Sequence, residues 1–387
     1  MPAKIEFPSE KRVRRELLAW FADAKRDLPW RRTRDPYAIL VSEVMLQQTR
    51  VETAIEYFKK FLAKFPNVRA LAGADINDVL AVWAGLGYYR RARMLHSAAK
   101  EIVTSHSARV PNDFEKLKSL PGIGAYTAGA IASIAYQIRV PAVDGNVIRV
   151  LSRILALRDD PYAKNGRAVI DDLATKLIND CDQPGAWTES LMELGATVCV
   201  PTNPNCSICP ISKDCGAFIK NLTLQIPPPK KRRAQESVRH AAAVVERGGE
   251  YLLFRRAPEQ INGGLFEFAT VELDSASMNA ATALASLVRE KADISVIVSE
   301  PVATIRHSIT YRRIDVEAYS MRVQRGTVSG GDWLSAAAAR LKGVTAATRK
   351  ILDAIETSNS KPIEKRPVED TNQTSRGGIR RIPAKNK

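Results

Sequence analysis

The sequence predicts two folded domains, an all-helical domain followed by a smaller α+β domain. Apolar residues recur at helical spacing from residue 10 to about residue 220. The run QIPPPKKRR at 225–233 then ends this pattern, because prolines cannot continue a helix and four consecutive basic residues stay solvated. Beyond it the apolar period changes to two, which is typical of strands. We therefore divide the 387 residues into a first domain (1–224), a linker (225–235), a second domain (236–356) and a tail (357–387).

The helical domain is predicted from a series of apolar stripes. The first helix presents Val13, Leu17, Trp20, Phe21 and Ala24 on one face. Further helices begin in the segments 39–46, 79–83 and 142–157. The last of these follows Asp144, whose side chain is of the type preferred at a helix N-cap. No alternating pattern separates these segments, so we expect an all-α domain.

The second domain is predicted to combine strands with a helix. The segment HAAAVVERGGEYLLFRR (240–256) is typical of a hairpin that turns at Gly248 and Gly249. A second alternating segment covers 312–321, and a helical pattern covers 280–292. The tail from Thr357 onward is rich in Ser, Asn, Pro, Gly and basic residues, so we expect it to be disordered.

The charge of the chain indicates a polyanionic partner. Its formal net charge is +16 and its isoelectric point is about 9.7. Nucleic acid is the first candidate, and an anionic membrane surface or a merely basic soluble protein are the alternatives. The N-terminus has no apolar signal segment, and no run approaches the roughly 20 apolar residues of a membrane span. We therefore expect a cytoplasmic protein with reduced cysteines.

Four cysteines are concentrated in one short segment, CVPTNPNCSICPISKDC. Their spacing is C-x6-C-x2-C-x5-C, and it comprises Cys199, Cys206, Cys209 and Cys215. Four thiolates can close around one structural zinc ion or one [4Fe–4S] cluster, and spacing alone does not separate the two. Because all four ligands would be used, the role is predicted to be structural. Cys181 lies outside the pattern and is interpreted as a small buried hydrophobe.

The stretch LPGIGAYTAGA (120–130) places a glycine-rich turn before a helix. Such a turn exposes backbone N–H groups to an anion, and in a basic protein that anion could be a DNA phosphate. A plain connection between two helices is the alternative. Earlier in the chain, Glu43 shares a helical face with Ile39, Leu40 and Leu46. We therefore expect Glu43 to be partly desolvated, with a raised pKa.

These features together resemble the helix-hairpin-helix DNA glycosylases that carry an iron–sulfur cluster, the endonuclease III-like superfamily. The resemblance covers residues 10–220, with the hairpin at about 113–136 and the cysteine loop at 199–215. Within it, four segments resemble the A/G-specific adenine DNA glycosylases: PWR (29–31), SEVMLQQTRV (42–51), GLGYYRRAR (85–93) and VDGNVIR (143–149). The resemblance implies a [4Fe–4S] cluster rather than zinc.

The resemblance also implies a reaction. Adenine opposite 8-oxoguanine or guanine in double-stranded DNA would be removed, leaving an abasic site, by a monomeric enzyme. Glu43 would protonate the base, Asp144 would stabilise the sugar cation or bond to it transiently, and Tyr126 and Asn146 would orient them. Bifunctional relatives carry a lysine where Tyr126 stands, and a phenol cannot form a Schiff base, so we expect no strand cleavage. Substrate and DNA contacts are predicted for Arg26, Trp30, Arg31, Leu46, Gln48, Thr49, Leu86, Tyr88, Gly122, Gly124, Glu189, Ser308 and Thr310.

The second domain resembles the C-terminal recognition domain of this family, which is related to the Nudix hydrolases. Only REKAD (289–293) remains of the acidic set that a hydrolase needs for Mg²⁺, so we expect recognition rather than hydrolysis. The family reads 8-oxoguanine with a Phe-Ser-His loop. This chain has Ile309-Thr310-Tyr311 there, after Arg306-His307-Ser308, so the hydroxyl is kept and the histidine is not.

Two other functions fit parts of the sequence. An endonuclease III-like pyrimidine glycosylase with lyase activity would share the helical domain, but Tyr126 and the second domain argue against it. A DNA-binding or cluster-sensing protein without catalysis would share the scaffold. The pair Glu43 and Asp144 argues against that function, because binding alone needs neither.

Overall fold

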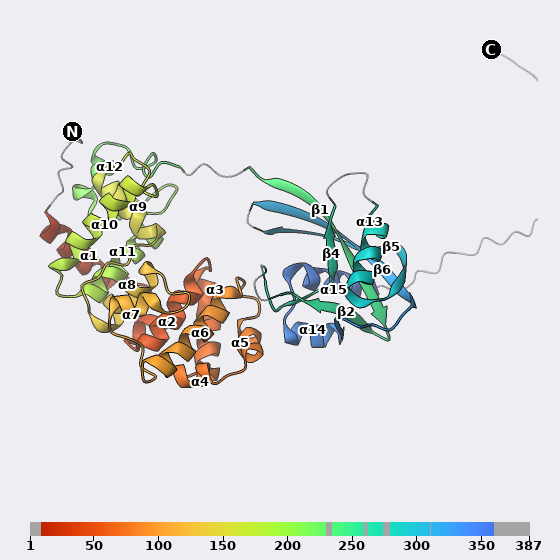
Figure 1. The fold of residues 1–387 in the computed structure, drawn as a ribbon. Helices are drawn as coiled ribbons and strands as arrows, with labels where there is room; N and C mark the ends of the chain where they lie inside the picture. Colours follow the sequence, from red (N-terminus) through yellow and green to blue (C-terminus); the bar gives the residue numbers. More distant parts are fainter. Residues whose placement is uncertain are drawn as a thin grey trace, which may run out of the picture.

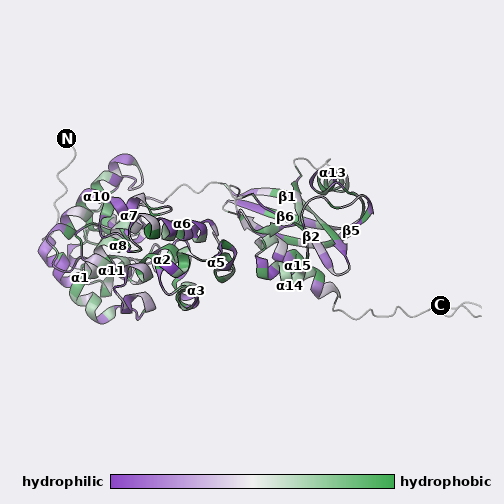
Figure 2. Ribbon diagram, turned by 60° about the horizontal axis from the view of Figure 1, so that its bottom comes forward, coloured by the Kyte–Doolittle hydropathy of each residue, from purple (hydrophilic) through white to green (hydrophobic). Residues whose placement is uncertain are grey.

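The computed structural model describes residues 9–229, 234–257, 260, 262–273, 279–309 and 311–359. Figure 1 shows two bodies beside each other, a helical one and one built on a sheet. This confirms the predicted fold class. Hydrophobic and hydrophilic residues alternate in bands along the helical ribbons (Figure 2), as expected of helices that bury one face. Among the described helices, none has the length and apolar character needed to cross a membrane.

The helical domain consists of two lobes, each with its own apolar core. The first lobe is continuous in sequence, and its core is centred on residues such as Leu40, Phe61, Trp83 and Ile131. It comprises η1 (Pro29–Arg32), α2 (Pro36–Leu46), α3 (Val51–Lys64), α4 (Val68–Ala72), α5 (Ile76–Trp83), α6 (Arg90–Ser105), α7 (Phe114–Ser119) and α8 (Ala125–Tyr136).

The second lobe joins the start of the domain to its end. Leu17 of the first helix packs in one core with Leu151, Leu177 and Trp187. Its elements are α1 (Glu10–Ala24), α9 (Gly145–Leu155), α10 (Lys164–Asn179) and α11 (Pro184–Thr197), followed by η2 (Cys206–Ile208), η3 (Ser212–Asp214) and α12 (Gly216–Ile219) around the cysteines. The chain therefore leaves this lobe after α1 and returns to it at α9, which places α2 and α8 opposite α9 and α11.

A capping aspartate leads into α9, and a glycine turn leads into α8. Asp144 is the N-cap of α9 and accepts a hydrogen bond from the Val147 amide, which confirms the predicted cap. The turn between α7 and α8 depends on Gly122, whose φ is 76°. A Cβ atom there would lie 2.4 Å from Met94 Cβ, so only glycine allows α6 to pack this closely.

The second domain is a mixed seven-stranded sheet between helices. Its path is β3-β2-β1-β6-β5, with β4 paired to β1 and β7 to β2. β1 runs parallel to β6 and antiparallel to β2 and β4. The elements are β1 (Glu236–Arg247), β2 (Glu250–Arg255), β3 (Phe266–Glu267), β4 (Ala269–Glu272), α13 (Ala280–Ala292), β5 (Ser295–Ile309), β6 (Arg312–Arg325), β7 (Asp332–Ser335), α14 (Ala336–Lys342) and α15 (Ala346–Asn359).

The period of two in β1 explains this layered arrangement. Ala241, Ala243 and Val245 pack against α13 on one face of the sheet. Ala242 and Val244 point to the opposite face, where α15 covers them. The predicted hairpin is confirmed, because β1 and β2 pair on either side of Gly248 and Gly249. Helix α15 ends at Asn359, and residues 360–387, most of the predicted tail, lie outside the described residues.

The two domains touch at helices α5 and α6. Leu265 of the second domain is 1% exposed and belongs to the core of the first lobe. The Arg93 guanidinium donates to the Gly263 carbonyl oxygen over 2.5 Å, and Arg255 donates to the Asn77 side-chain oxygen over 2.6 Å. The second domain is therefore held against α5, which precedes the segment GLGYYRRAR, and α6, which begins within it.

Candidate active site

A cavity of about 350 Å³ lies between the two lobes of the helical domain. Helices α2 and α8 form one wall, and α9 and α11 form the other. Many of the predicted site residues line it: Arg26, Trp30, Arg31, Glu43, Leu46, Gln48, Thr49, Tyr126, Asp144, Asn146 and Glu189. Its volume is within the range of small-molecule sites, so it can hold a ring system of nucleobase size.

Glu43 faces this cavity from α2 and is 5% exposed, which confirms its predicted burial. The Tyr126 hydroxyl donates a hydrogen bond to its Oε2 over 2.7 Å. Burial raises the pKa of Glu43 to about 7, and the negative charges of Asp144 and Glu189 act in the same direction, while the Tyr126 hydrogen bond opposes them. Glu43 can therefore hold a proton near neutral pH and release it.

Asp144 faces the same cavity from the start of α9. Its Oδ1 accepts from the Val147 amide over 2.7 Å, and its Oδ2 accepts from the Asn146 side chain over 2.8 Å. Burial raises the pKa of Asp144, although both hydrogen bonds favour the carboxylate. The side chain is fixed by the helix that it caps, so its position does not depend on a bound substrate.

The α11 wall carries an ion-pair cluster whose pairing the sequence did not suggest. Glu193 on α11 accepts from Arg26 Nε over 2.7 Å and from Arg31 Nη2 over 2.8 Å. Arg31 Nε also lies 3.5 Å from Glu189, which accepts from Arg34 over 3.1 Å. Glu189 and Glu193 are four residues apart and share a helix face, and this spacing was the available indication.

Of the remaining predicted residues, those that the structure describes do not line the cavity. Leu86 is buried in the core of the first lobe, whereas Tyr88 is 55% exposed. Gly122 and Gly124 form the turn before α8, and Gly124 is its N-cap. Ser308 is exposed on β5, opposite Arg313. Thr310 lies outside the described residues.

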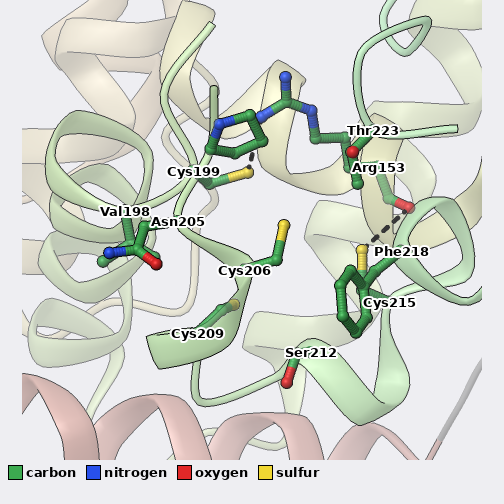
Figure 3. Close-up of a pocket in the computed structure, with 11 residues that line it drawn as sticks. Arg153, Val198, Cys199, Asn205, Cys206, Cys209, Ser212, Cys215, Phe218 and Thr223 are labelled. Atoms are coloured by element: carbon green, nitrogen blue, oxygen red, sulfur yellow. Dashed lines mark hydrogen bonds between the residues drawn. The ribbon is translucent and has the colours of Figure 1, made fainter. Parts of the chain in front are cut away.

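The four clustered cysteines line one small cavity beside α9 (Figure 3). All four are free thiols, and Figure 3 shows their sulfur atoms turned toward a common space. Within the described ranges, no three His, Cys, Asp or Glu side chains are placed so that they could hold a metal ion. Cys181 is buried elsewhere, in the core of the second lobe, as predicted.

Two arginines of α9 bind the cysteine loop. The buried Arg153 donates to Cys199 Sγ over 3.3 Å and to the Val200 carbonyl over 2.8 Å. Arg149 donates to the Cys199 carbonyl over 2.7 Å and to Asn146 Oδ1 over 2.8 Å. Since Asn146 also holds Asp144, the loop and the cavity share one hydrogen-bonded chain.

Each of the two domains matches a known protein family. The HhH-GPD superfamily of base excision DNA repair proteins matches residues 41–174, and the NUDIX domain matches residues 240–354. The rat adenine DNA glycosylase is 33% identical over 89% of this chain and 78% of its own length.

Further relatives agree with these matches. The adenine DNA glycosylase of Arabidopsis thaliana is 35% identical over 82% of this chain, which spans only 58% of that relative. Among solved structures, a thermostable thymine-DNA glycosylase matches 55% of this chain and 97% of its own, with 27% identity and a TM-score of 0.50. The chain therefore belongs to the adenine DNA glycosylases of the HhH-GPD superfamily.

Proposed function

We propose that the protein is a monofunctional adenine DNA glycosylase that excises adenine paired with 8-oxoguanine or guanine. The observation that carries this proposal is the pairing of two carboxyl groups in one cavity, Glu43 with a pKa of about 7 and Asp144 with fixed hydrogen bonds. The family to which the chain belongs supports adenine as the base. Acting on duplex DNA, the enzyme works as a monomer in the cytoplasm, at the chromosome.

The reaction begins when the adenosine leaves the base stack and enters the cavity. Glu43 gives its proton to N7 of adenine, and the electrons of the glycosidic bond pass to the base, which departs neutral. The deoxyribose is left with a positive charge shared by C1′ and the ring oxygen. The Asp144 carboxylate stabilises this cation. Water then adds to C1′, and its proton returns to the Glu43 carboxylate.

The absence of strand cleavage is supported by the walls of the cavity. Cleavage of the lyase type needs an amine that forms a Schiff base with the sugar. Tyr126 occupies the position after the turn and uses its hydroxyl on Glu43. Among the described residues that line the cavity, none is a lysine.

A single-turnover assay tests the reaction. Duplexes would carry adenine opposite 8-oxoguanine, adenine opposite guanine, or thymine glycol, and products would be resolved on gels before and after hot alkali. We expect adenine release from the first two duplexes and strand breaks only after alkali. Alkali-independent breaks, or excision of thymine glycol alone, would identify the lyase alternative. Tight binding without excision would identify a DNA-binding protein.

We further propose that Cys199, Cys206, Cys209 and Cys215 hold a [4Fe–4S] cluster. Four free thiols that line one small cavity supply the four ligands that such a cluster takes, and the family resemblance favours the cluster over zinc. The cluster would stabilise the loop that Arg149 and Arg153 bind. Protein purified without oxygen should be brown and contain about four irons per chain. Stoichiometric zinc without iron would contradict the assignment.

We propose that the second domain distinguishes 8-oxoguanine from guanine. Ser308 is exposed at the end of β5, next to the segment that contains Thr310. A hydroxyl on an exposed residue can donate to or accept from a base edge, which supports a recognition role. Replacing Ser308 by Ala should slow the excision of adenine opposite 8-oxoguanine. Excision of adenine opposite guanine should stay unchanged, so the ratio of the first rate to the second should fall. Equal loss on both substrates would contradict this role.

A further inference from the structure

Arg91 joins two loops that are distant in sequence. It lies in the first turn of α6, half-buried, and its Nη1 donates to the carbonyl oxygens of Val44 over 3.0 Å and Met45 over 2.9 Å. The same nitrogen donates to the Gln47 carbonyl. Nη1 of Arg91 thus donates to the carbonyl groups at the end of α2, which have no hydrogen-bond donor from a following turn of that helix.

The second terminal nitrogen of Arg91 reaches both loops. Its Nη2 donates to Thr49 Oγ1 over 3.1 Å, to the Leu86 carbonyl over 3.3 Å and to the Gly87 carbonyl over 3.2 Å. The guanidinium also lies over the rings of Trp83 and Tyr88, with centroid distances of 5.4 and 5.5 Å. A single side chain therefore bridges the loop 47–50, after α2, and the loop 84–89, before α6.

Each of these loops presents one exposed side chain on a backbone conformation that is unfavourable for it. Gln48 has a φ of 56° and Tyr88 a φ of 48°, in the left-handed region. Such residues persist only when the surroundings determine their conformation. The Arg91 contacts lie at the neighbours of both residues, so they contribute to holding both conformations.

We propose that Arg91 is the positioning residue for base extrusion, which holds Gln48 and Tyr88 together where they enter the duplex as the adenosine leaves it. This inference rests on the proposed function, because it assigns a role within the same reaction. Arg91 does not line the cavity and touches neither Glu43 nor Asp144. Its effect is therefore expected before the glycosidic bond breaks.

The substitution Arg91→Lys distinguishes the positioning role of Arg91 from an effect of its positive charge. Lysine keeps the positive charge, but its single ammonium cannot serve six acceptors from a planar fork or stack on two rings. Arg90→Lys is the matched control, because the neighbouring Arg90 is exposed and the change also conserves charge. Circular dichroism would establish that both variants keep their helices.

Two measurements on full-length protein test the role. The first places the fluorescent base 2-aminopurine at the target position opposite 8-oxoguanine and follows its unstacking by stopped flow. We expect Arg91→Lys to slow unstacking at least tenfold and Arg90→Lys to leave it unchanged. The pH at which excision falls should be the same in all three proteins, because Glu43 is not affected. A wild-type unstacking rate in Arg91→Lys, or a displaced pH profile, would overturn the inference.

The second measurement does not depend on the reaction. Hydrogen–deuterium exchange of the free protein should show that Arg91→Lys loses protection in segments 47–50 and 84–89 together. Loss in one segment only would overturn the inference even if unstacking slows. If wild type unstacks 2-aminopurine but releases no adenine, the proposed function fails while Arg91 is still judged by these two measurements. If wild type does not unstack the base, both fail.

Discussion

Two buried glutamates on opposite walls of one cavity show how the environment determines charge. Glu43 is 5% exposed and Glu193 is 1% exposed, so burial by itself acts to raise the pKa of each carboxyl. The hydrogen bonds from Arg26 and Arg31 outweigh burial at Glu193 and lower its pKa to about 2. Among the described residues, the Tyr126 hydroxyl is the one hydrogen-bond donor to Glu43, and the pKa of Glu43 rises to about 7.

The hydrogen-bond donors, rather than the depth of burial, separate a proton donor from a fixed charge at this cavity. Glu193 stays ionised and anchors two arginines at the cavity wall. Glu43 carries an exchangeable proton in the pH range where the reaction must occur. Pairs of carboxyl groups with divergent pKa values are a recurring basis for assigning acid and base roles.

The largest expected effect is the loss of the proton at Glu43. Glu43→Gln keeps the shape of the side chain but cannot deliver a proton, so excision should fall by about 10²–10⁴-fold. Binding of the lesion duplex should be retained, which a filter-binding titration would measure beside the single-turnover rate. Full activity in this variant would mean that the acid lies elsewhere.

The next effect is on stability, at Glu193. Glu193→Gln leaves Arg26 and Arg31 without their shared counter-charge, and breaking a buried pair typically costs about 3–5 kcal/mol. Urea unfolding followed by circular dichroism would measure the loss. Asp27→Asn is the matched control, because Asp27 pairs with Arg32 at the surface and should cost less than about 1 kcal/mol. Similar losses in both variants would refute the contrast.

The smallest effect is a shift in the pH profile. In the proposed reaction the acid form of Glu43 is the active one, so the single-turnover rate should decline as the pH rises through about 7. The Tyr126 hydroxyl favours the carboxylate, so Tyr126→Phe should raise the Glu43 pKa and move the decline to higher pH, by about one unit. Single-turnover rates measured from about pH 5 to about pH 9 would show the shift of the decline. A move to lower pH would contradict the assigned direction.

Much of the fold followed from local sequence patterns. Helical spacing placed Glu43 on an apolar face, and the capping residue Asp144 marked the start of α9. The glycine pair at 248–249 marked the hairpin of the second domain. These features depend on neighbours within a few residues, because helix periodicity, caps and turns are set by short-range backbone geometry.

The partners of these residues depended on packing between distant segments. Arg26 and Arg31 meet Glu193 across separations of 167 and 162 residues, and Arg91 meets carbonyl groups more than 40 residues away. Leu86, a predicted DNA contact, likewise lies in the core of the first lobe, which the local pattern did not reveal. The sequence by itself determined which residues could titrate, cap or bind metal. Only the tertiary structure decided which carboxyl keeps its proton, because that depends on the donors, Arg26, Arg31 and Tyr126, that packing brings to each carboxyl.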